Sequence, residues 1–173
     1  MASVIKLFDE REIAHRVEEL ATRIAGVIHG EFVVVGILKG SFVFVADLIR
    51  ALDRAGCAPR VDFIRLSSYG QATESSGDVR LIGEVPSAVA GQVVLLADDV
   101  ADTGLSLSRA KALLEAAGAA KVWTCAAVDK PSRRRVDFTP DFVCFTVGAQ
   151  FVVGYGIDRA ERYRHLPYIG VVD

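Results

Sequence analysis

The sequence predicts an α/β protein in which a central, mainly parallel β-sheet is flanked by helices. Apolar runs rich in β-branched residues alternate with segments whose apolar residues recur every three or four positions, which is the order of repeated strand–helix units. Polar and charged residues directly follow several strand-like runs, where a parallel sheet places its ligand site. The chain has 173 residues, 51% of them hydrophobic, which suffices for a sizeable core. We therefore expect a single domain over residues 1–173.

The first predicted element is a helix that begins after Asp9, because Asp9 and Glu12 have the spacing of a capping box. Apolar residues from Ile13 to Ile24 recur at three-and-four spacing and give this helix one buried face. Strands and helices then alternate along the chain. We expect strands at 32–38, at 61–66, from 93 onward and at 122–128, and helices at 42–56 and 105–118.

Two segments depart from this alternation. Residues 67–78 are polar, rich in Ser and Gly and without apolar periodicity, which predicts a mobile lid. After Lys130-Pro131 the strand–helix alternation ends, and only two short strand-like pieces follow, at 142–147 and 151–154. We expect the segment of about 130–173, together with the N-terminus, to form a small hood over the site.

The run from Val93 to Leu107 is the most informative part of the sequence. An apolar strand leads into Asp98, Asp99 and then Asp102, and Thr-Gly-Leu-Ser follows at 103–106, where a helix begins. Carboxylates at the end of a strand can hold ribose hydroxyls or a hard cation, and N–H groups at a helix start can hold a phosphate. The pattern therefore predicts a phosphate–sugar site. Asp and Thr also cap helices and Gly relieves turns, so a cap-and-turn role stays open.

The composition narrows the classes of partner and the compartment. A formal net charge of −2 gives no overall attraction to nucleic acid or to an anionic membrane, and we expect neither as a partner. Cys57, Cys125 and Cys144 are widely spaced without a CxxC pair, which predicts reduced thiols and a cytoplasmic protein. The N-terminus soon becomes charged, and no apolar run reaches a membrane-spanning length.

Four segments, in this order and spacing, resemble the bacterial hypoxanthine phosphoribosyltransferases of the type I phosphoribosyltransferase family. Together they extend over nearly the whole chain. The last of them, which continues to Ile169, is the most specific. The segments are Leu-Lys-Gly-Ser at 38–41, Ser-Ser-Tyr-Gly at 67–70, the acidic motif at 98–106 and Phe-Val-Val-Gly-Tyr-Gly-Ile-Asp at 151–158.

This resemblance implies the type I phosphoribosyltransferase fold and an activity in purine salvage. The enzyme would transfer ribose 5-phosphate from phosphoribosyl pyrophosphate (PRPP) to hypoxanthine, and also to guanine. The products would be IMP or GMP and pyrophosphate. The resemblance further implies Mg²⁺ as the cofactor and a homodimer or homotetramer.

The resemblance also assigns residues to the PRPP site. Asp98, Asp99 and Asp158 would be ligands of Mg²⁺, and the first two would also face the ribose hydroxyls. Asp102 would be the general base near the purine N7 proton, provided that it lies within hydrogen-bond reach. The peptide between Leu38 and Lys39 can be cis in this family. The residues that would bind PRPP are Lys39, Gly40, Asp98, Asp99, Asp102, Thr103, Gly104, Leu105, Ser106 and Arg164.

On the purine side, the resemblance implies that Lys130 donates to the 6-oxo group, which an ammonium can do because it only donates hydrogen bonds. Phe151 would stack on the base. Val152 would contribute its main chain, and Asp158 would complete the purine site. Ser68 and Tyr69 would lie on the lid that excludes water from the reacting centre.

Several of these residues have simpler interpretations. Asp102 fits a helix cap, Lys130 an exposed loop residue and Phe151 a core residue. The arginines at 133–135, together with Arg159 and Arg162, are interpreted as solvated or intersubunit charges.

One departure from the family concerns purine preference. Many relatives carry a Pro-acid pair just before the position of Phe151, whereas this chain has Val-Gly-Ala-Gln at 147–150. The preference among hypoxanthine, guanine and xanthine therefore stays open, and a xanthine- or guanine-preferring enzyme is one alternative. A PRPP- or nucleotide-sensing regulator with little catalysis and a generic nucleotide-binding module are two others.

Overall fold

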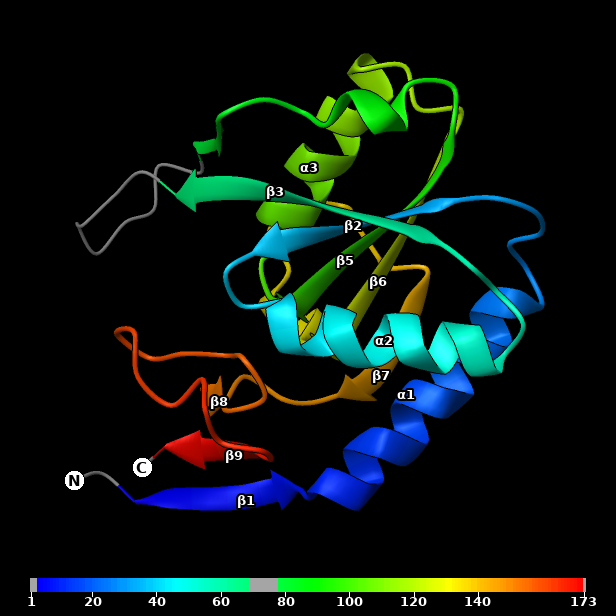
Figure 1. The fold of residues 1–173 in the computed structure, drawn as a ribbon. Helices are drawn as coiled ribbons and strands as arrows, with labels where there is room; N and C mark the ends of the chain where they lie inside the picture. Colours follow the sequence, from blue (N-terminus) through cyan, green and yellow to red (C-terminus); the bar gives the residue numbers. More distant parts are fainter. Residues whose placement is uncertain (1–2, 69–77, 173) are drawn as a thin grey trace.

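The computed structural model describes residues 3–68 and 78–172. Six strands of these ranges form the main sheet: β2 (Val33–Leu38), β3 (Arg60–Ser68), β4 (Val79–Ile82), β5 (Val93–Ala101), β6 (Lys121–Asp129) and β7 (Phe142–Thr146). Their order is β4-β3-β2-β5-β6-β7, with β4 antiparallel to β3 and every other pair parallel (Figure 1). The prediction of a central, mainly parallel sheet is confirmed.

Helices cover both faces of the main sheet (Figure 1). The helices α1 (Glu10–Ala25) and α2 (Phe42–Arg54) pack on one face, and α3 (Leu105–Ala116) packs on the other. Short 3₁₀ helices lie at Ser87–Val89 and Pro131–Arg133. Because successive strand residues point to opposite faces, Val34 and Leu95 join the core under α1 and α2, whereas Val33 and Leu96 join the core under α3.

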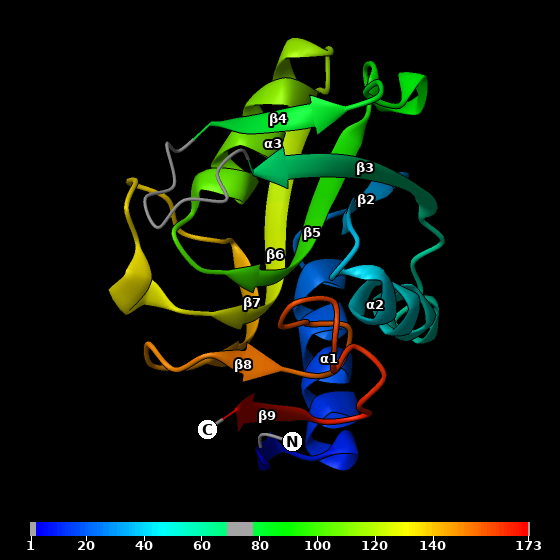
Figure 2. The same ribbon diagram turned by 90° about the vertical axis from the view of Figure 1, so that its left-hand side faces the viewer.

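A second, smaller sheet joins the two ends of the chain. Its strands β1 (Val4–Phe8), β9 (Ile169–Val172) and β8 (Val152–Val153) are antiparallel and lie in that order. Figure 2 shows this small sheet beyond β7, beside α1. The ring of Phe8 stacks on Phe145 of β7 with the centroids 4.0 Å apart, so apolar contacts connect the two sheets.

The structure differs from the sequence-based expectations in several elements. The piece predicted at 142–147 is β7 of the main sheet, where it pairs with β6, so the part of the predicted hood segment that joins β1 in the small sheet lies after Thr146. The strand from Val93 continues through the two acids to Ala101. Neither β1 nor β4 is predicted from the sequence, because both are short and only partly buried edge strands.

The helix predicted after Asp9 has the expected capping box. Asp9 Oδ1 accepts the N–H of Glu12 at 2.9 Å, and Glu12 Oε2 accepts the N–H of Asp9 at 2.9 Å. Among the residues that the structure describes, no helix is long and apolar enough to span a membrane. Cys125 and Cys144 are buried free thiols, as predicted.

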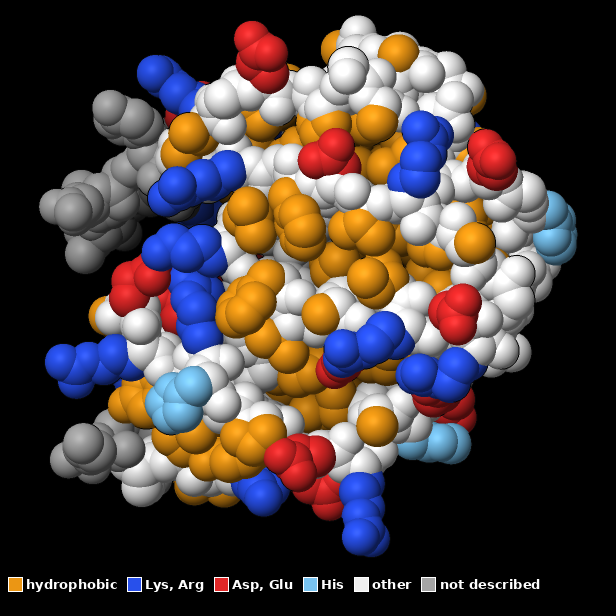
Figure 3. All heavy atoms as spheres, viewed as in Figure 1, with side chains coloured by type: hydrophobic (Ala, Val, Ile, Leu, Met, Phe, Trp, Pro, Cys, Tyr) orange, Lys and Arg blue, Asp and Glu red, His pale blue; other side chains and the backbone are white. Residues whose placement is uncertain are grey.

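One face of the molecule carries exposed apolar side chains, which we call the apolar face. It is defined by Phe42, Val61, Phe63 and Ile82, each between 36% and 47% exposed. Figure 3 shows hydrophobic side chains gathered over α2 and β3. Phe42 is the first residue of α2 and points outward at 46% exposure.

Candidate active site

The candidate site lies where the loops after β2, β5 and β6 meet the loop between β8 and β9. One part of it is a polar cleft of about 390 Å³ at the carboxyl end of β2. We call it the anion cleft because it is lined by three basic side chains. These are Lys39, Arg65 and Arg164, which share the cleft with Asp99, Asp158, Glu161 and the residues at 38, 40, 66, 67 and 82.

The β2 loop and the β5 loop are packed against each other at Gly40. A Cβ atom at position 40 would lie 1.9 Å from Asp99 Oδ2, far inside contact distance. Glycine at this position is therefore what allows the two loops to approach so closely. The Leu38–Lys39 peptide is cis, in agreement with the family resemblance.

Asp98 and Asp99 form a pair of neighbouring carboxyl groups at the end of β5. Asp98 is buried, and its Oδ1 accepts the N–H of Asp99 at 2.9 Å. Asp99 lines the anion cleft. Burial raises the pKa of Asp98 well above its usual range, and the charge of Asp99 adds to the rise. Burial also raises the pKa of Asp99. A cation or hydroxyl donors here would therefore stabilise the charged forms.

The loop at 102–106 encloses a small hollow of about 50 Å³ in front of α3. Gly104 has a φ of +86°, which a residue with a side chain seldom adopts, and a Cβ there would lie 2.8 Å from Arg134 Cδ. The main chain turns at Gly104 and α3 begins at Leu105, as predicted. Residues 100–104, 106 and 107 line the hollow, so it is open to the hydroxyls of Thr103 and Ser106.

Asp102 lies between two basic side chains. Its Oδ1 accepts a hydrogen bond from Arg133 Nε at 3.0 Å, and its Oδ2 is 3.8 Å from Lys130 Nζ. The alternative of a helix cap is wrong, because Gly104 is the N-cap of α3 and the N–H of Leu105 donates to Thr103 Oγ1, at 3.3 Å, and not to Asp102. Lys130 is only 4% exposed, so the interpretation as an exposed loop residue is also wrong. Burial lowers the pKa of Lys130, whereas the charge of Asp102 acts in the opposite direction.

Phe151 lies next to this group. Its ring is 51% exposed, which contradicts the alternative of a core residue, and Lys130 Nζ is 5.5 Å from the ring centroid. Arg159 contacts the same ring at 5.8 Å. Val152 follows as the buried first residue of β8. An exposed aromatic ring beside a buried lysine offers a planar ligand both a stacking face and a hydrogen-bond donor.

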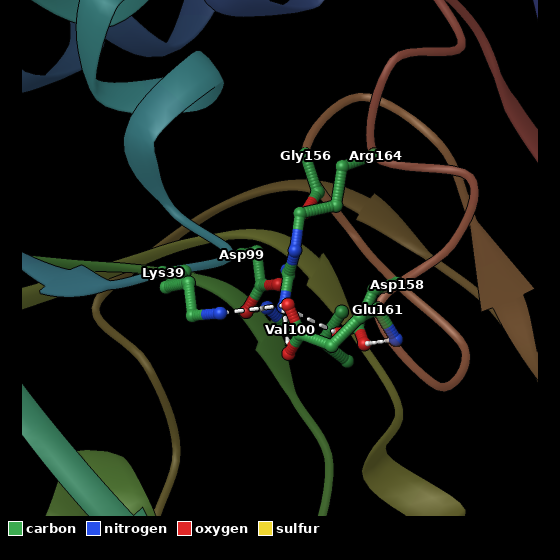
Figure 4. Close-up of polar contacts among 7 residues, drawn as sticks. All are labelled: Lys39, Asp99, Val100, Gly156, Asp158, Glu161 and Arg164. Atoms are coloured by element: carbon green, nitrogen blue, oxygen red, sulfur yellow. Dashed lines mark hydrogen bonds and ion pairs between the residues drawn. The ribbon is translucent and has the colours of Figure 1, made fainter.

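Arg164 reaches into the anion cleft from the other side. Its NH1 group donates to the carbonyl oxygen of Gly156 at 2.8 Å, and its NH2 group is 3.0 Å from Asp158 and 3.2 Å from Glu161. Glu161 also pairs with Lys39 at 2.7 Å. Figure 4 shows these side chains converging beside Asp99.

The arginines at 133–135 do not act merely as solvated charges. Arg134 pairs with Asp129 at 2.5 Å, with the two side chains only 14% and 10% exposed. It also donates to the carbonyl oxygens of Ala101 and Asp102, at 3.1 and 2.8 Å. Arg133 contacts Asp102, as described above. Arg134, in the loop that follows β6, thus holds the main chain of the acidic motif in place.

Sequence reasoning missed four residues of the site: Arg65, Arg133, Arg134 and Glu161. Charged side chains are common on loops and at exposed strand positions, so only their place in the folded site reveals a role. Of the two expected lid residues, Ser68 is the last residue of β3, and Tyr69 lies outside the described residues.

Comparisons with known proteins agree with this geometry. Residues 4–160 match the family model described as a phosphoribosyl transferase domain. The chain is 42% identical over 167 residues to the hypoxanthine-guanine phosphoribosyltransferase of Bacillus subtilis, which covers 96% of this chain and 91% of that protein. It is 39% identical over 169 residues to the hypoxanthine phosphoribosyltransferase of Escherichia coli, and this match covers 96% of the present chain and 93% of the relative. The crystal structure of a Bacillus anthracis hypoxanthine-guanine phosphoribosyltransferase matches with a TM-score of 0.91 and 40% identity, over 100% of both chains.

Proposed function

Because the chain belongs to the phosphoribosyl transferase domain family, and within it to the hypoxanthine phosphoribosyltransferases, we propose that it transfers ribose 5-phosphate from PRPP to hypoxanthine and guanine. The products are IMP or GMP and pyrophosphate. The observation that carries this proposal is the position of Asp102. Asp102 lines the hollow at the start of α3 and also lies beside Lys130, the buried lysine next to the exposed ring of Phe151.

The phosphoribosyl half of the site, as we name it, comprises Lys39, Gly40, Asp98, Asp99, 103–106 and Arg164. The hollow at the start of α3 would hold the 5′-phosphate, where hydroxyls and free N–H groups converge. Cleavage at the anomeric carbon leaves negative charge on the departing pyrophosphate. The ammonium of Lys39 and the planar guanidinium of Arg164 would stabilise that charge in the anion cleft.

The purine half comprises Lys130, Phe151 and Val152, with Asp158 as its outer member. Lys130 would donate to the 6-oxo group, which selects against the 6-amino group of adenine because an ammonium has no acceptor. Phe151 would stack on the base, and the main chain of Val152 would meet its edge. Asp102 would take the proton from N7 as the new bond to the sugar forms.

The residues at the anion cleft fit Mg²⁺. This ion is usually held by one or two carboxylates together with substrate phosphates, and Asp99 and Asp158 line the cleft with Asp98 buried beside them. Within residues 3–68 and 78–172, no cluster of three or more His, Cys, Asp or Glu side chains could hold a metal alone. When bound, Mg²⁺ would neutralise charge on pyrophosphate and hold ribose hydroxyls.

The proposed reaction is tested by incubating the purified protein with PRPP, MgCl₂ and, separately, hypoxanthine, guanine, xanthine and adenine. Nucleotide and pyrophosphate formation are measured in parallel. We expect turnover with hypoxanthine and guanine and none with adenine. Turnover confined to xanthine would instead favour the alternative suggested by Val147–Gln150. Folded protein that binds PRPP but turns over no base would overturn the enzyme and favour a nucleotide-sensing regulator.

We also propose that the enzyme is a homodimer or a dimer of dimers, and that a second copy covers the apolar face. Monomeric proteins seldom expose contiguous apolar patches of large size. The apolar face borders the anion cleft, since Ile82 lines both and Arg65, two positions after Phe63 on β3, lines the cleft. Light scattering during size-exclusion chromatography should give twice or four times the chain mass. Phe63→Lys should shift this value toward one chain mass.

A further inference from the structure

Glu161 holds together the two cations that we assign to the pyrophosphate. One carboxylate oxygen is 2.7 Å from Lys39 Nζ, and the other is 3.2 Å from the NH2 group of Arg164 (Figure 4). Lys39 directly follows β2, and Arg164 lies 125 positions later in the sequence. The fold brings the two side chains together in the anion cleft. The carboxylate therefore lies where an anionic ligand would meet both cations.

The backbone around Glu161 favours this placement. Ala160 and Glu161 have φ values of +52° and +62°, a region that side-chain-bearing residues seldom occupy. The N–H of Glu161 donates to Asp158 Oδ2 at 2.8 Å, which closes the turn. The turn thus holds the Glu161 side chain over the cleft instead of leaving it on an ordinary solvent-facing loop.

The contacts of Glu161 contribute little to stability. Its side chain is 64% exposed and that of Lys39 is 51% exposed. The pair with Lys39 is therefore strongly screened by solvent. The Arg164 side chain is only 19% exposed, but it already has a closer carboxylate partner in Asp158, at 3.0 Å. The pairing with Lys39 and Arg164 lowers the pKa of Glu161, so the carboxylate stays charged at neutral pH. A conformation that is locally unfavourable and adds little stability needs another explanation.

We propose that Glu161 is an internal substitute for pyrophosphate. It neutralises Lys39 and Arg164 while the cleft is free of ligand and is displaced when the pyrophosphate group enters. This inference rests on the proposed function, because it identifies Glu161 as a residue that competes with the leaving group. A pyrophosphate group carries more negative charge than one carboxylate and displaces it. The returning carboxylate then helps to expel the pyrophosphate product.

The test compares Glu161→Gln with the wild-type enzyme. The amide keeps the size of the side chain but loses the charge, so it pairs weakly with both cations. The affinity for magnesium pyrophosphate, measured by calorimetry, should rise about threefold to tenfold, as expected for loss of an exposed ion pair with Lys39 and a partly buried one with Arg164. Pyrophosphate should become a stronger product inhibitor by the same factor, and the difference should shrink at high salt.

Two further variants make the result specific. Glu161→Asp keeps the charge but is too short to bridge both cations, so its affinity should lie between those of the wild type and Glu161→Gln. Glu115→Gln removes the same charge near the end of α3, about 15 Å along the helix from the loop at its start. This control should bind pyrophosphate like the wild type.

The outcomes separate this inference from the proposed function. If the wild type binds neither pyrophosphate nor PRPP, the proposed function fails. If the wild type binds and turns over, but Glu161→Gln binds pyrophosphate equally well or more weakly, the inference fails. Weaker binding that depends on the Mg²⁺ concentration would assign Glu161 to metal binding and overturn its role as a competitor.

Discussion

The phosphoribosyl half and the purine half of the site differ in how the chain brings their groups together. In the first, Asp98, Asp99 and the loop at 103–106 follow one another at the end of β5 and the start of α3. In the second, Lys130 comes from the end of β6 and Phe151 precedes β8, so tertiary packing must join them. Most of the phosphoribosyl half is therefore encoded in a short motif, to which packing adds the β2 loop and Arg164 from the β8–β9 loop. The purine half depends entirely on the placement of the small sheet.

Two residues connect the halves. Asp102 belongs to the acidic motif, yet both of its side-chain contacts, Lys130 and Arg133, come from the β6 loop. Arg134 leaves the same loop and holds the carbonyl oxygens of Ala101 and Asp102. Substitution of Asp102 should therefore affect the chemical step between the halves, and substitution of Arg134 should disturb both halves, whereas substitutions elsewhere should disturb only one.

The largest effect is expected at Asp102. Asp102→Asn removes the proton acceptor and should lower kcat by roughly 10²- to 10⁴-fold, the usual contribution of a general base. The KM for PRPP should change far less, because the phosphate contacts remain. Steady-state kinetics with both substrates varied will measure this, with Asp53→Asn on α2 as the control. Turnover that stays at the wild-type level would remove Asp102 from the role of base.

Arg134→Met tests the connection itself. It leaves Asp129 buried without its partner, which costs about 3–5 kcal/mol of unfolding free energy and lowers Tm by about 10 °C in a chain of this size. At a temperature where the variant is folded, kcat should fall and both substrates should bind more weakly. Arg109→Met, at an exposed position of α3, should stay within about 0.5 kcal/mol of the wild type. If Arg134→Met loses stability but keeps wild-type kinetics, Arg134 has no part in positioning Asp102.

The sequence predicts the features that depend on local patterns and misses those that depend on distant contacts. The alternation of apolar strands and amphipathic helices predicted the parallel sheet, and the Val93–Leu107 run located the strand-to-helix turn, because both signals are local. The assignment of β7 to the hood was wrong because strand pairing is set by contacts distant in the sequence.

The site shows the same limit. Glu161 and Arg134 have no local signal, since an acid in a loop and an arginine in a basic run are common surface residues. Their roles depend on partners 122 and 5 positions away. For Arg134, the sequence distance to Asp129 is short, but its contacts with the carbonyl oxygens of Ala101 and Asp102 exist only in the folded chain.

Gly40→Ala should disturb the phosphoribosyl half alone. The added Cβ would overlap Asp99 Oδ2, so the two loops must separate. We expect the KM for PRPP to rise at least about tenfold, with purine-nucleotide binding less affected and a stability loss of about 1–3 kcal/mol. Gly26→Ala, where the nearest atom to a new Cβ is 3.5 Å away, is the control for a tolerated glycine. Equal weakening of PRPP and purine binding would show that the halves are not separable at this position.

Lys130 provides the complementary and smallest change, confined to the purine half. Lys130→Met should weaken hypoxanthine binding about tenfold, the value of one hydrogen bond from a charged donor, and leave PRPP binding nearly intact.

The pH dependence of hypoxanthine binding tests the same contact independently. Burial lowers the pKa of Lys130 in the folded protein. As the pH rises, Lys130 therefore loses its proton at a lower pH than an ordinary lysine does. The affinity for hypoxanthine should begin to fall at a pH below about 10.4, the usual pKa of lysine. The purine also ionises in alkaline solution, so the profile of Lys130→Met serves as the reference, and only the difference between the two profiles reports Lys130. Identical profiles would mean that the ammonium does not contact the base, and the selection against adenine would then depend on main-chain groups near Val152.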